Sequence, residues 1–177
     1  MIPILARGFS MHDDPIAFFL TWPTYGTWLP GDERGWIEYH KGWQMPDPTR
    51  LVRSTERMKE SMCLLDEAAR DIVETQVAET CQFRKWVLHA VACRSNHMHV
   101  AIGAFDTHHK KIRIDIKAWC TRRLKQHIDS DRENWWAERG SVRYVWNDEQ
   151  LARVIEYITE AQDRKDRDES RQSQPDA

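Results

Sequence analysis

Two histidines separated by one residue are the part of this sequence that most directly suggests chemistry. His97 and His99 lie in residues 93–103, which read CRSNHMHVAIG. Because side chains alternate along a strand, both imidazoles would point to one face and Met98 to the other. Two neutral imidazoles on one face can bind a divalent metal ion, with further ligands completing its shell. A pair of ordinary strand histidines is the alternative, because the motif is short.

A tyrosine near the end of the chain is the candidate partner of these histidines. Of the four tyrosines, only Tyr157 lies in a segment with a clear helical period, residues 151–162, LARVIEYITEAQ. The apolar residues of this segment form one stripe, and Tyr157 falls at its edge, where its hydroxyl is free to reach a site beside the sheet. The alternative is a structural tyrosine whose ring packs on the core and whose hydroxyl is exposed to solvent. Gln162 lies near the middle of the stripe, where a buried amide needs partners unless the helix has already frayed.

The elements that must position these residues follow from the periodicity. Strands are expected at residues 16–22, 86–93, 97–104 and 144–146, and helices at 66–84, at 110–127 and from Asn147 or Asp148 to about 162. A long ordered loop rich in Gly, Pro and Trp is expected over about 23–48. This order predicts an α+β fold, a ferredoxin-like antiparallel sheet with helices packed on it.

Composition limits the classes of protein that fit. The chain has 177 residues, of which 41% are hydrophobic and 31% charged, so we expect one domain over residues 1–162 and a charged, disordered tail over 163–177. No apolar run approaches the ~20 residues of a membrane helix, and no basic segment opens a signal peptide. The four cysteines form no CxxC pair and are expected to be reduced and buried, with the cytoplasm as the default location.

The net charge of the chain is −2, so a basic surface that binds nucleic acid would have to be local. The expected helix at 110–127 has only one acid, Asp115, and its basic residues are predicted to contact phosphates: Lys110, Lys111, Arg113, Lys117, Arg122, Arg123 and Lys125. The alternative is a solvated helix face. Arg94, Arg139 and Arg143 lie in expected turns and could add contacts. Four aromatic residues of the long loop would either stack on unpaired bases or form a small core of their own: Trp22, Tyr25, Trp28 and Trp36.

Taken together, these motifs give the chain a family resemblance. The RSNHMHV hairpin, the TWPTYGTWLPGDERGW, KAWCTRRLK and RGSVRYVW segments and the YITEAQ helix end resemble the HUH single-tyrosine transposases of small bacterial insertion sequences. Within that family, the chain most resembles the REP-associated tyrosine transposases and similar stand-alone transposase-like proteins. The resemblance covers roughly residues 18–162. It implies that the histidines lie on a central strand of the sheet.

The resemblance also implies roles for individual residues. His97 and His99 would bind Mg²⁺ or Mn²⁺, and Tyr157 would attack a phosphate of single-stranded or hairpin DNA to form a covalent phosphotyrosine. Many relatives have a glutamine or asparagine four residues after the tyrosine as a further ligand. Ala161 occupies that position here and Gln162 follows it, so a local helix distortion would have to restore Gln162, or Glu160 or water would substitute.

Other functions remain open at this point. The chain could be another HUH nicking enzyme, or a domesticated DNA-binding protein of the same fold that has lost catalysis. Relatives work as monomers or as homodimers in which the tyrosine of one chain serves the histidines of the other. The sequence alone does not decide between these arrangements.

Overall fold

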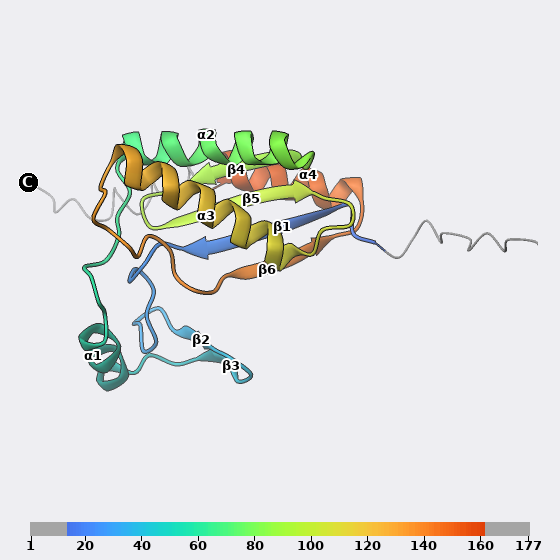
Figure 1. The fold of residues 1–177 in the computed structure, drawn as a ribbon. Coiled ribbons are helices and arrows are strands. Elements are labelled where there is room, and N and C mark those ends of the chain that lie inside the picture. The colour runs from blue at the N-terminus through green and yellow to red at the C-terminus, as the bar shows by residue number, and fades with distance from the viewer. Residues whose placement is uncertain (1–13, 162–177) are drawn as a thin grey trace, which may run out of the picture.

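A four-stranded antiparallel sheet forms the centre of the protein (Figure 1). The computed structural model describes residues 14–161. The strands follow the order β4-β5-β1-β6, with bounds β1 (Ala17–Pro23), β4 (Val87–Cys93), β5 (His97–Gly103) and β6 (Ser141–Val145). The strand that carries the two histidines, β5, is therefore an inner strand, as expected.

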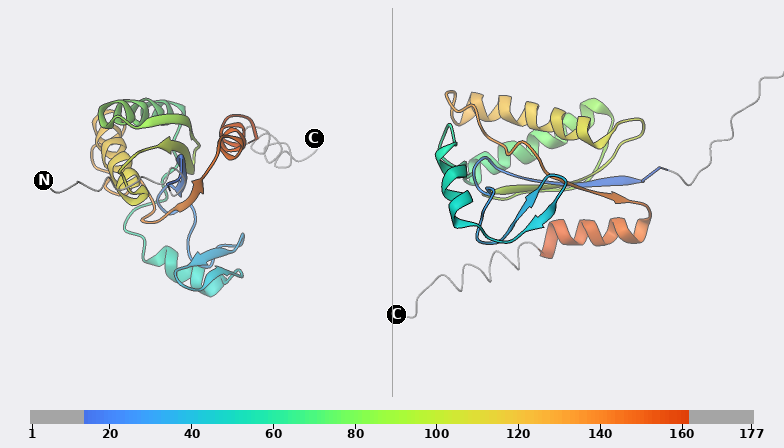
Figure 2. Two further views of the ribbon diagram at one scale, coloured as in Figure 1. Left: turned by 90° about the vertical axis from the view of Figure 1, so that its right-hand side faces the viewer. Right: turned by 90° about the horizontal axis from the view of Figure 1, so that it is seen from below.

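Helices cover both faces of the sheet. α2 (Glu67–Arg84) and α3 (His109–His127) lie on one face, and α4 (Asp148–Glu156) lies on the other (Figure 2). The order β1, α2, β4, β5, α3, β6 is the ferredoxin-like βαββαβ plan, so the predicted α+β fold is confirmed. α4 is an addition that covers the second face.

Strand β1 explains how one sheet supports two cores. Its alternate residues Phe18, Leu20 and Trp22 belong to the core beneath α2 and α3. Ala17 and Phe19 belong to the smaller core beneath α4. Side chains of a strand alternate between faces, and a strand buried on both faces needs apolar residues at nearly every position. This is why residues 17–22 read AFFLTW without a polar alternation.

An insertion between β1 and α2 forms a lobe at one end of the sheet (Figure 1). It contains a two-stranded ribbon, β2 (Trp36–Glu38) and β3 (Gly42–Gln44), and the helix α1 (Pro48–Glu56). The sequence predicts only a loop over about 23–48, and that prediction is wrong for the ribbon. Strands of three residues are too short to establish a period of two. α1 has no buried residue, so its sequence has no apolar stripe from which the helix could be predicted.

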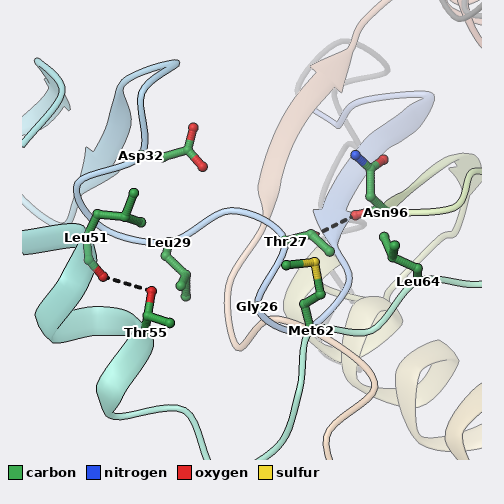
Figure 3. A pocket seen from close by; sticks show the side chains of 9 residues that line it. All are labelled: Gly26, Thr27, Leu29, Asp32, Leu51, Thr55, Met62, Leu64 and Asn96. Carbon is green, nitrogen blue, oxygen red and sulfur yellow. Dashed lines mark hydrogen bonds between the residues drawn. The ribbon is translucent and has the colours of Figure 1, made fainter. Parts of the chain in front are cut away.

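Backbone hydrogen bonds attach this lobe to the end of the sheet. The N–H of Thr24 donates to the carbonyl of Asn96 at 2.9 Å, and that of Cys63 donates to the carbonyl of Tyr25 at 2.8 Å. A cavity of about 340 Å³ remains beside these contacts (Figure 3). It is lined by Gly26, Thr27, Leu29, Asp32, Leu51, Thr55, Met62, Leu64 and Asn96.

The other expected elements are present with small shifts at their ends. Asn147 caps α4, since its side chain accepts a hydrogen bond from the N–H of Gln150 at 2.9 Å. α4 then continues as a π-helix, η1 (Tyr157–Ala161). No helix within residues 14–161 is long and apolar enough to span a membrane. The expected tail at 163–177 lies outside the described residues.

Candidate metal and nucleophile site

His97 and His99 lie side by side on the face of the sheet that α4 covers. Their ring centroids are 4.6 Å apart. Strand β5 pairs with β1 so that His99 lies opposite Thr21 and His97 lies opposite Pro23. The ring of Phe19, which belongs to the core beneath α4, lies 5.6 Å from the ring of His99. The predicted common face of the two imidazoles is therefore present.

His99 is buried and has one unused nitrogen. Its side chain is 5% exposed. Nδ1 lies 2.8 Å from the hydroxyl oxygen of Thr21, whereas Nε2 is buried without a hydrogen-bond partner among residues 14–161. Burial, with smaller effects of the neighbouring His97 and Arg94, lowers the pKa of His99 to about 3. His99 is therefore neutral at physiological pH, which is the form that ligates metals.

The turn before β5 sets the orientation of His97. Nδ1 of His97 lies 2.6 Å from the side-chain oxygen of Asn96. Because an amide oxygen only accepts, Nδ1 of His97 donates this hydrogen bond. The carbonyl of Asn96 accepts in turn from the hydroxyl of Thr27 at 3.0 Å (Figure 3). The inserted lobe thus holds the residue that orients His97, as outer-shell partners do in metal sites.

Tyr157 lies beside the histidines of its own chain. It is the first residue of η1, and its ring lies 5.5 Å from the ring of His99 in an edge-to-face arrangement. Its side chain is 42% exposed, whereas Ile158 is 0% exposed in the core beneath α4. The packing of Val154 and Ile158 on the sheet therefore brings Tyr157 to the histidine pair, and Tyr157 lies at the edge of the apolar stripe as predicted.

The donor set fits a divalent ion that takes nitrogen ligands and further oxygen ligands. The buried Nε2 of His99 is a polar atom without a partner, which a native core rarely tolerates. No group of three or more His, Cys, Asp or Glu side chains that could hold a metal occurs within residues 14–161. Gln162, the predicted third ligand, lies outside the described residues.

Most of the predicted phosphate-binding residues lie away from this face. α3 packs against α2 and the other side of the sheet. Several of its cations have partners there: Lys111 and Asp115, Arg123 and Glu79, and Lys125 and Glu133 form ion pairs, Lys117 donates to the carbonyl of Ala137, and Arg113 donates to that of Gly140. Two predicted residues are exceptions. Arg94 is close enough to His99 to affect its pKa. Arg143 lies in strand β6, not in the expected turn, and its guanidinium is 5.7 Å from the Phe19 ring on the histidine face.

The aromatic residues of the long loop divide between core and surface. Trp22 is 0% exposed and Trp36 is 6% exposed, so neither can stack on a base, and the core alternative holds for both. The hydroxyl of Tyr25 accepts a hydrogen bond from the N–H of Lys59 at 2.9 Å. Trp28 remains 43% exposed.

Sequence reasoning missed the residues that orient the imidazoles. Thr21 is the only polar residue in an apolar strand, and that isolation is the signal that could have found it. Asn96 is the last residue of the turn before β5 and adjoins His97, and its short amide side chain was a second signal. Neither position has a spacing that predicts which histidine it contacts.

Comparison with known proteins adds two structures. No family model matches the chain, and no curated protein matches it. The chain is similar to the crystal structure of a candidate transposase from Deinococcus radiodurans, with 17% identity over 88% of this chain and 95% of that one and a TM-score of 0.47. It is also similar to a REP-associated tyrosine transposase bound to a REP hairpin, with 12% identity over 87% of this chain and 70% of that one and the same TM-score of 0.47.

Proposed function

We propose that this protein is a metal-dependent endonuclease and strand transferase, a transposase that acts on single-stranded, hairpin-containing DNA. One observation carries the proposal. The ring of Tyr157 lies 5.5 Å from the ring of His99, and His99 has a buried Nε2 without a hydrogen-bond partner among residues 14–161. A tyrosine beside a pair of histidines on one face of the sheet is the arrangement that the HUH resemblance implies.

His97 and His99 would hold the metal through their Nε2 atoms, with Mg²⁺ or Mn²⁺ as the proposed ion. When bound, the ion would offset the negative charge of a phosphate and orient it. Thr21 and Asn96 would hold the two rings through their Nδ1 atoms, so that the Nε2 atoms could turn toward the ion. Imidazole is a modest ligand for Mg²⁺, which favours Mn²⁺ in an assay.

Gln162 is the proposed third ligand. The expected spacing after the tyrosine in an α-helix is four residues, and Ala161 occupies that position. The helix is of the π type from Tyr157 to Ala161, and a π-helix hydrogen bond joins residues five apart rather than four. Gln162 is five residues after Tyr157, so the π segment supports it as a ligand although it lies outside the described residues.

Tyr157 would be the nucleophile. Its hydroxyl oxygen forms a bond to phosphorus while the bond from phosphorus to the 3′ oxygen breaks, and the departing 3′ oxygen takes up a proton as the tyrosine loses one. The product is a 5′-phosphotyrosine and a free 3′ hydroxyl. The phosphodiester bond is replaced by another phosphoester, so a second 3′ hydroxyl can reverse the step and join a new strand.

The basic residues would contact the DNA on both faces of the sheet. Arg94 affects the pKa of His99 and Arg143 lies over the ring of Phe19, so both would contact the backbone close to the cleaved phosphate. The α3 residues Lys110, Lys111, Arg113, Lys117, Arg122, Arg123 and Lys125 lie across the sheet and would meet a more distant part of the hairpin.

Covalent capture tests the proposal directly. A labelled single-stranded hairpin DNA is incubated with the protein and Mn²⁺ and separated by denaturing electrophoresis. A protein–DNA band should form, and Tyr157→Phe and His97→Ala should each abolish it. Tyr144→Phe is the matched control, because Tyr144 is 40% exposed against 42% for Tyr157 but lies in the neighbourhood of Phe18 on the opposite face.

The outcomes separate the alternatives. Hairpin binding without a covalent band in the wild type would identify a DNA-binding protein that has lost catalysis. A band that persists in Tyr157→Phe would assign the nucleophile to another residue. Cleavage without rejoining to a second strand would favour a nicking enzyme over a transposase.

A further inference from the structure

The β2–β3 ribbon has one buried face and one exposed apolar face. On the inner face, Trp36 is 6% exposed and the guanidinium of Arg50 lies 4.4 Å from its ring centroid. Ile37 and Trp43 are paired across the ribbon on the other face and are 60% and 58% exposed. Tyr39 and Met45 follow the ends of the two strands directly and are 63% and 70% exposed. This set of four residues, Ile37, Tyr39, Trp43 and Met45, is called the outer face.

The indole ring of Trp43 packs against the backbone of Gly35. Gly35 has a positive φ of 79°, and a Cβ built on it would lie 2.5 Å from the indole ring of Trp43. The ring therefore rests on bare backbone on one side, whereas the side chain as a whole stays 58% exposed. The indole of Trp28 donates to the carbonyl of Gly35 at 2.8 Å and fixes that backbone. Such a ring is prepared to stack, because little freedom is lost when a planar group lies on it.

One arginine contacts the outer face and a second lies near the histidine site. The guanidinium of Arg139 lies 4.2 Å from the ring centroid of Tyr39. Arg143 is four residues further along the chain, and its guanidinium lies over Phe19, whose ring contacts that of His99. Neither Arg139 nor Arg143 forms an ion pair with a carboxylate in the described part of the chain.

The arrangement in space agrees with a continuous surface. The free end of the ribbon points toward the side of the sheet that α4 covers, away from α2 and α3 (Figure 2). Gly140, which follows Arg139, packs closely on β1, since a Cβ there would lie 2.4 Å from the carbonyl oxygen of Thr21. Arg139 is thereby placed beside the strand whose Thr21 contacts His99.

We propose that the outer face, together with Arg139 and Arg143, binds an unpaired nucleic-acid strand that leads to His97 and His99. Tyr39 and Trp43 stack on bases, and the two arginines contact the phosphates between them and the site. Aromatic rings interleaved with cations that lack carboxylate partners are the usual composition of a single-strand path. The inference rests on the proposed function for the destination of the strand, and it adds a binding surface that the two histidines and Tyr157 do not supply.

Strand binding is measured apart from cleavage. All variants are made in a Tyr157→Phe background, with EDTA present, and fluorescence anisotropy reports binding of a labelled oligodeoxythymidine. Trp43→Ala and Tyr39→Ala should each weaken binding by about 5- to 150-fold, the range expected for one stacked base. Trp43→Phe should restore most of the affinity. Arg139→Gln should reduce the slope of log affinity against log salt by about 0.7, the value for one phosphate contact on a single strand.

Trp146→Ala is the matched control for Trp43→Ala. Trp146 is 50% exposed and stacks on Tyr144, so it offers a comparable indole that does not belong to the outer face. Its removal should leave strand affinity unchanged. Equal losses for Trp146→Ala and Trp43→Ala would overturn the inference, because the effect would then not be specific to the ribbon.

Two further results separate this inference from the proposed function. If the wild type forms the covalent band but Trp43→Ala and Tyr39→Ala bind the oligonucleotide like their parent, the ribbon inference is wrong and the function stands. If no band forms but the ribbon variants lose strand binding, the function fails and the binding surface stands. The oligomeric state of the wild type and Trp43→Ala is measured by sedimentation. If the wild type is a dimer and Trp43→Ala is a monomer with unchanged strand affinity, the outer face is a protein interface and the inference is overturned.

Discussion

The hydroxyl oxygen of Thr21 lies 2.8 Å from Nδ1 of His99, on the neighbouring strand. This contact joins the first strand of the sheet to the buried imidazole, 78 residues further along the chain. With the proton on Nδ1, the Thr21 oxygen accepts it and Nε2 has the lone pair. Thr21 is therefore positioned to hold the ring plane of His99.

Thr21→Val should weaken metal binding without unfolding the protein. Valine has nearly the shape of threonine but no oxygen, so Nδ1 loses its hydrogen-bond partner and the imidazole loses its orientation. Loss of such an outer-shell partner costs about 10- to 100-fold in metal affinity. Titration with Mn²⁺ followed by electron paramagnetic resonance measures this affinity. Thr21→Ser should restore it, and a valine variant that binds Mn²⁺ like the wild type would contradict the assignment.

Ile158→Ala should destabilise the protein and displace Tyr157. Ile158 is 0% exposed beneath α4, and truncation of such a residue costs about 2–5 kcal/mol of the free energy of unfolding. Urea unfolding measures the loss, and the covalent DNA band should fall with it at temperatures where the variant stays folded. Ile114→Ala on α3 is the matched control, since Ile114 is 64% exposed and should change stability by less than about 0.5 kcal/mol.

The four cysteines should be unreactive in the folded protein. All four are free and buried, and burial raises the pKa of Cys81 to about 11 and that of Cys93 to about 12. Since the thiolate is the reacting form, a chromogenic disulfide reagent should label the native protein very slowly and label four thiols after denaturation. Phe105→Cys, at a position that is 84% exposed, should add one fast-reacting thiol. Rapid labelling of the unmodified native protein would show that a buried cysteine is accessible.

Lys117 should make stability rise with pH in the alkaline range. Its ammonium group donates to the carbonyl of Ala137 at 2.6 Å and lies 5.6 Å from the Trp22 ring centroid. Burial, with a smaller effect of Arg113, lowers the pKa of Lys117 from 10.5 to about 8, and Glu138 opposes the shift. Between these two values the unfolded chain binds more protons than the folded one, so the free energy of unfolding increases with pH.

Urea unfolding of wild type and Lys117→Met at a series of pH values measures this contribution. The difference between the two proteins should change from about pH 8 to about pH 10 and stay constant at lower pH, where Lys117 is protonated in both states. Parallel stability curves throughout this range would mean that the folded pKa of Lys117 is not lowered.

Local patterns in the sequence determined most of the elements and the candidate pair of ligands. Strand β5 could be predicted because it follows a turn and ends in the apolar run VAI, and alternation alone places His97 and His99 on one face. The last helix could be predicted from the spacing of its apolar residues and from the capping side chain of Asn147. These features depend on neighbours a few residues apart, so they are already present in the order of the chain.

Tertiary structure decided which of these residues meet. Tyr157 comes to His99 only because Val154 and Ile158 pack on the sheet, and the desolvation of Nε2 in His99 follows from that packing. The same holds for the aromatic residues, because Trp22 and Trp36 are buried whereas Tyr39 and Trp43 remain exposed. The basic helix α3 looked suited to the site by its charge, yet its apolar residues bind it to the opposite face. Whether a residue is buried, and which distant residues it contacts, depends on how the layers pack together. The spacing of residues along the chain does not show either property.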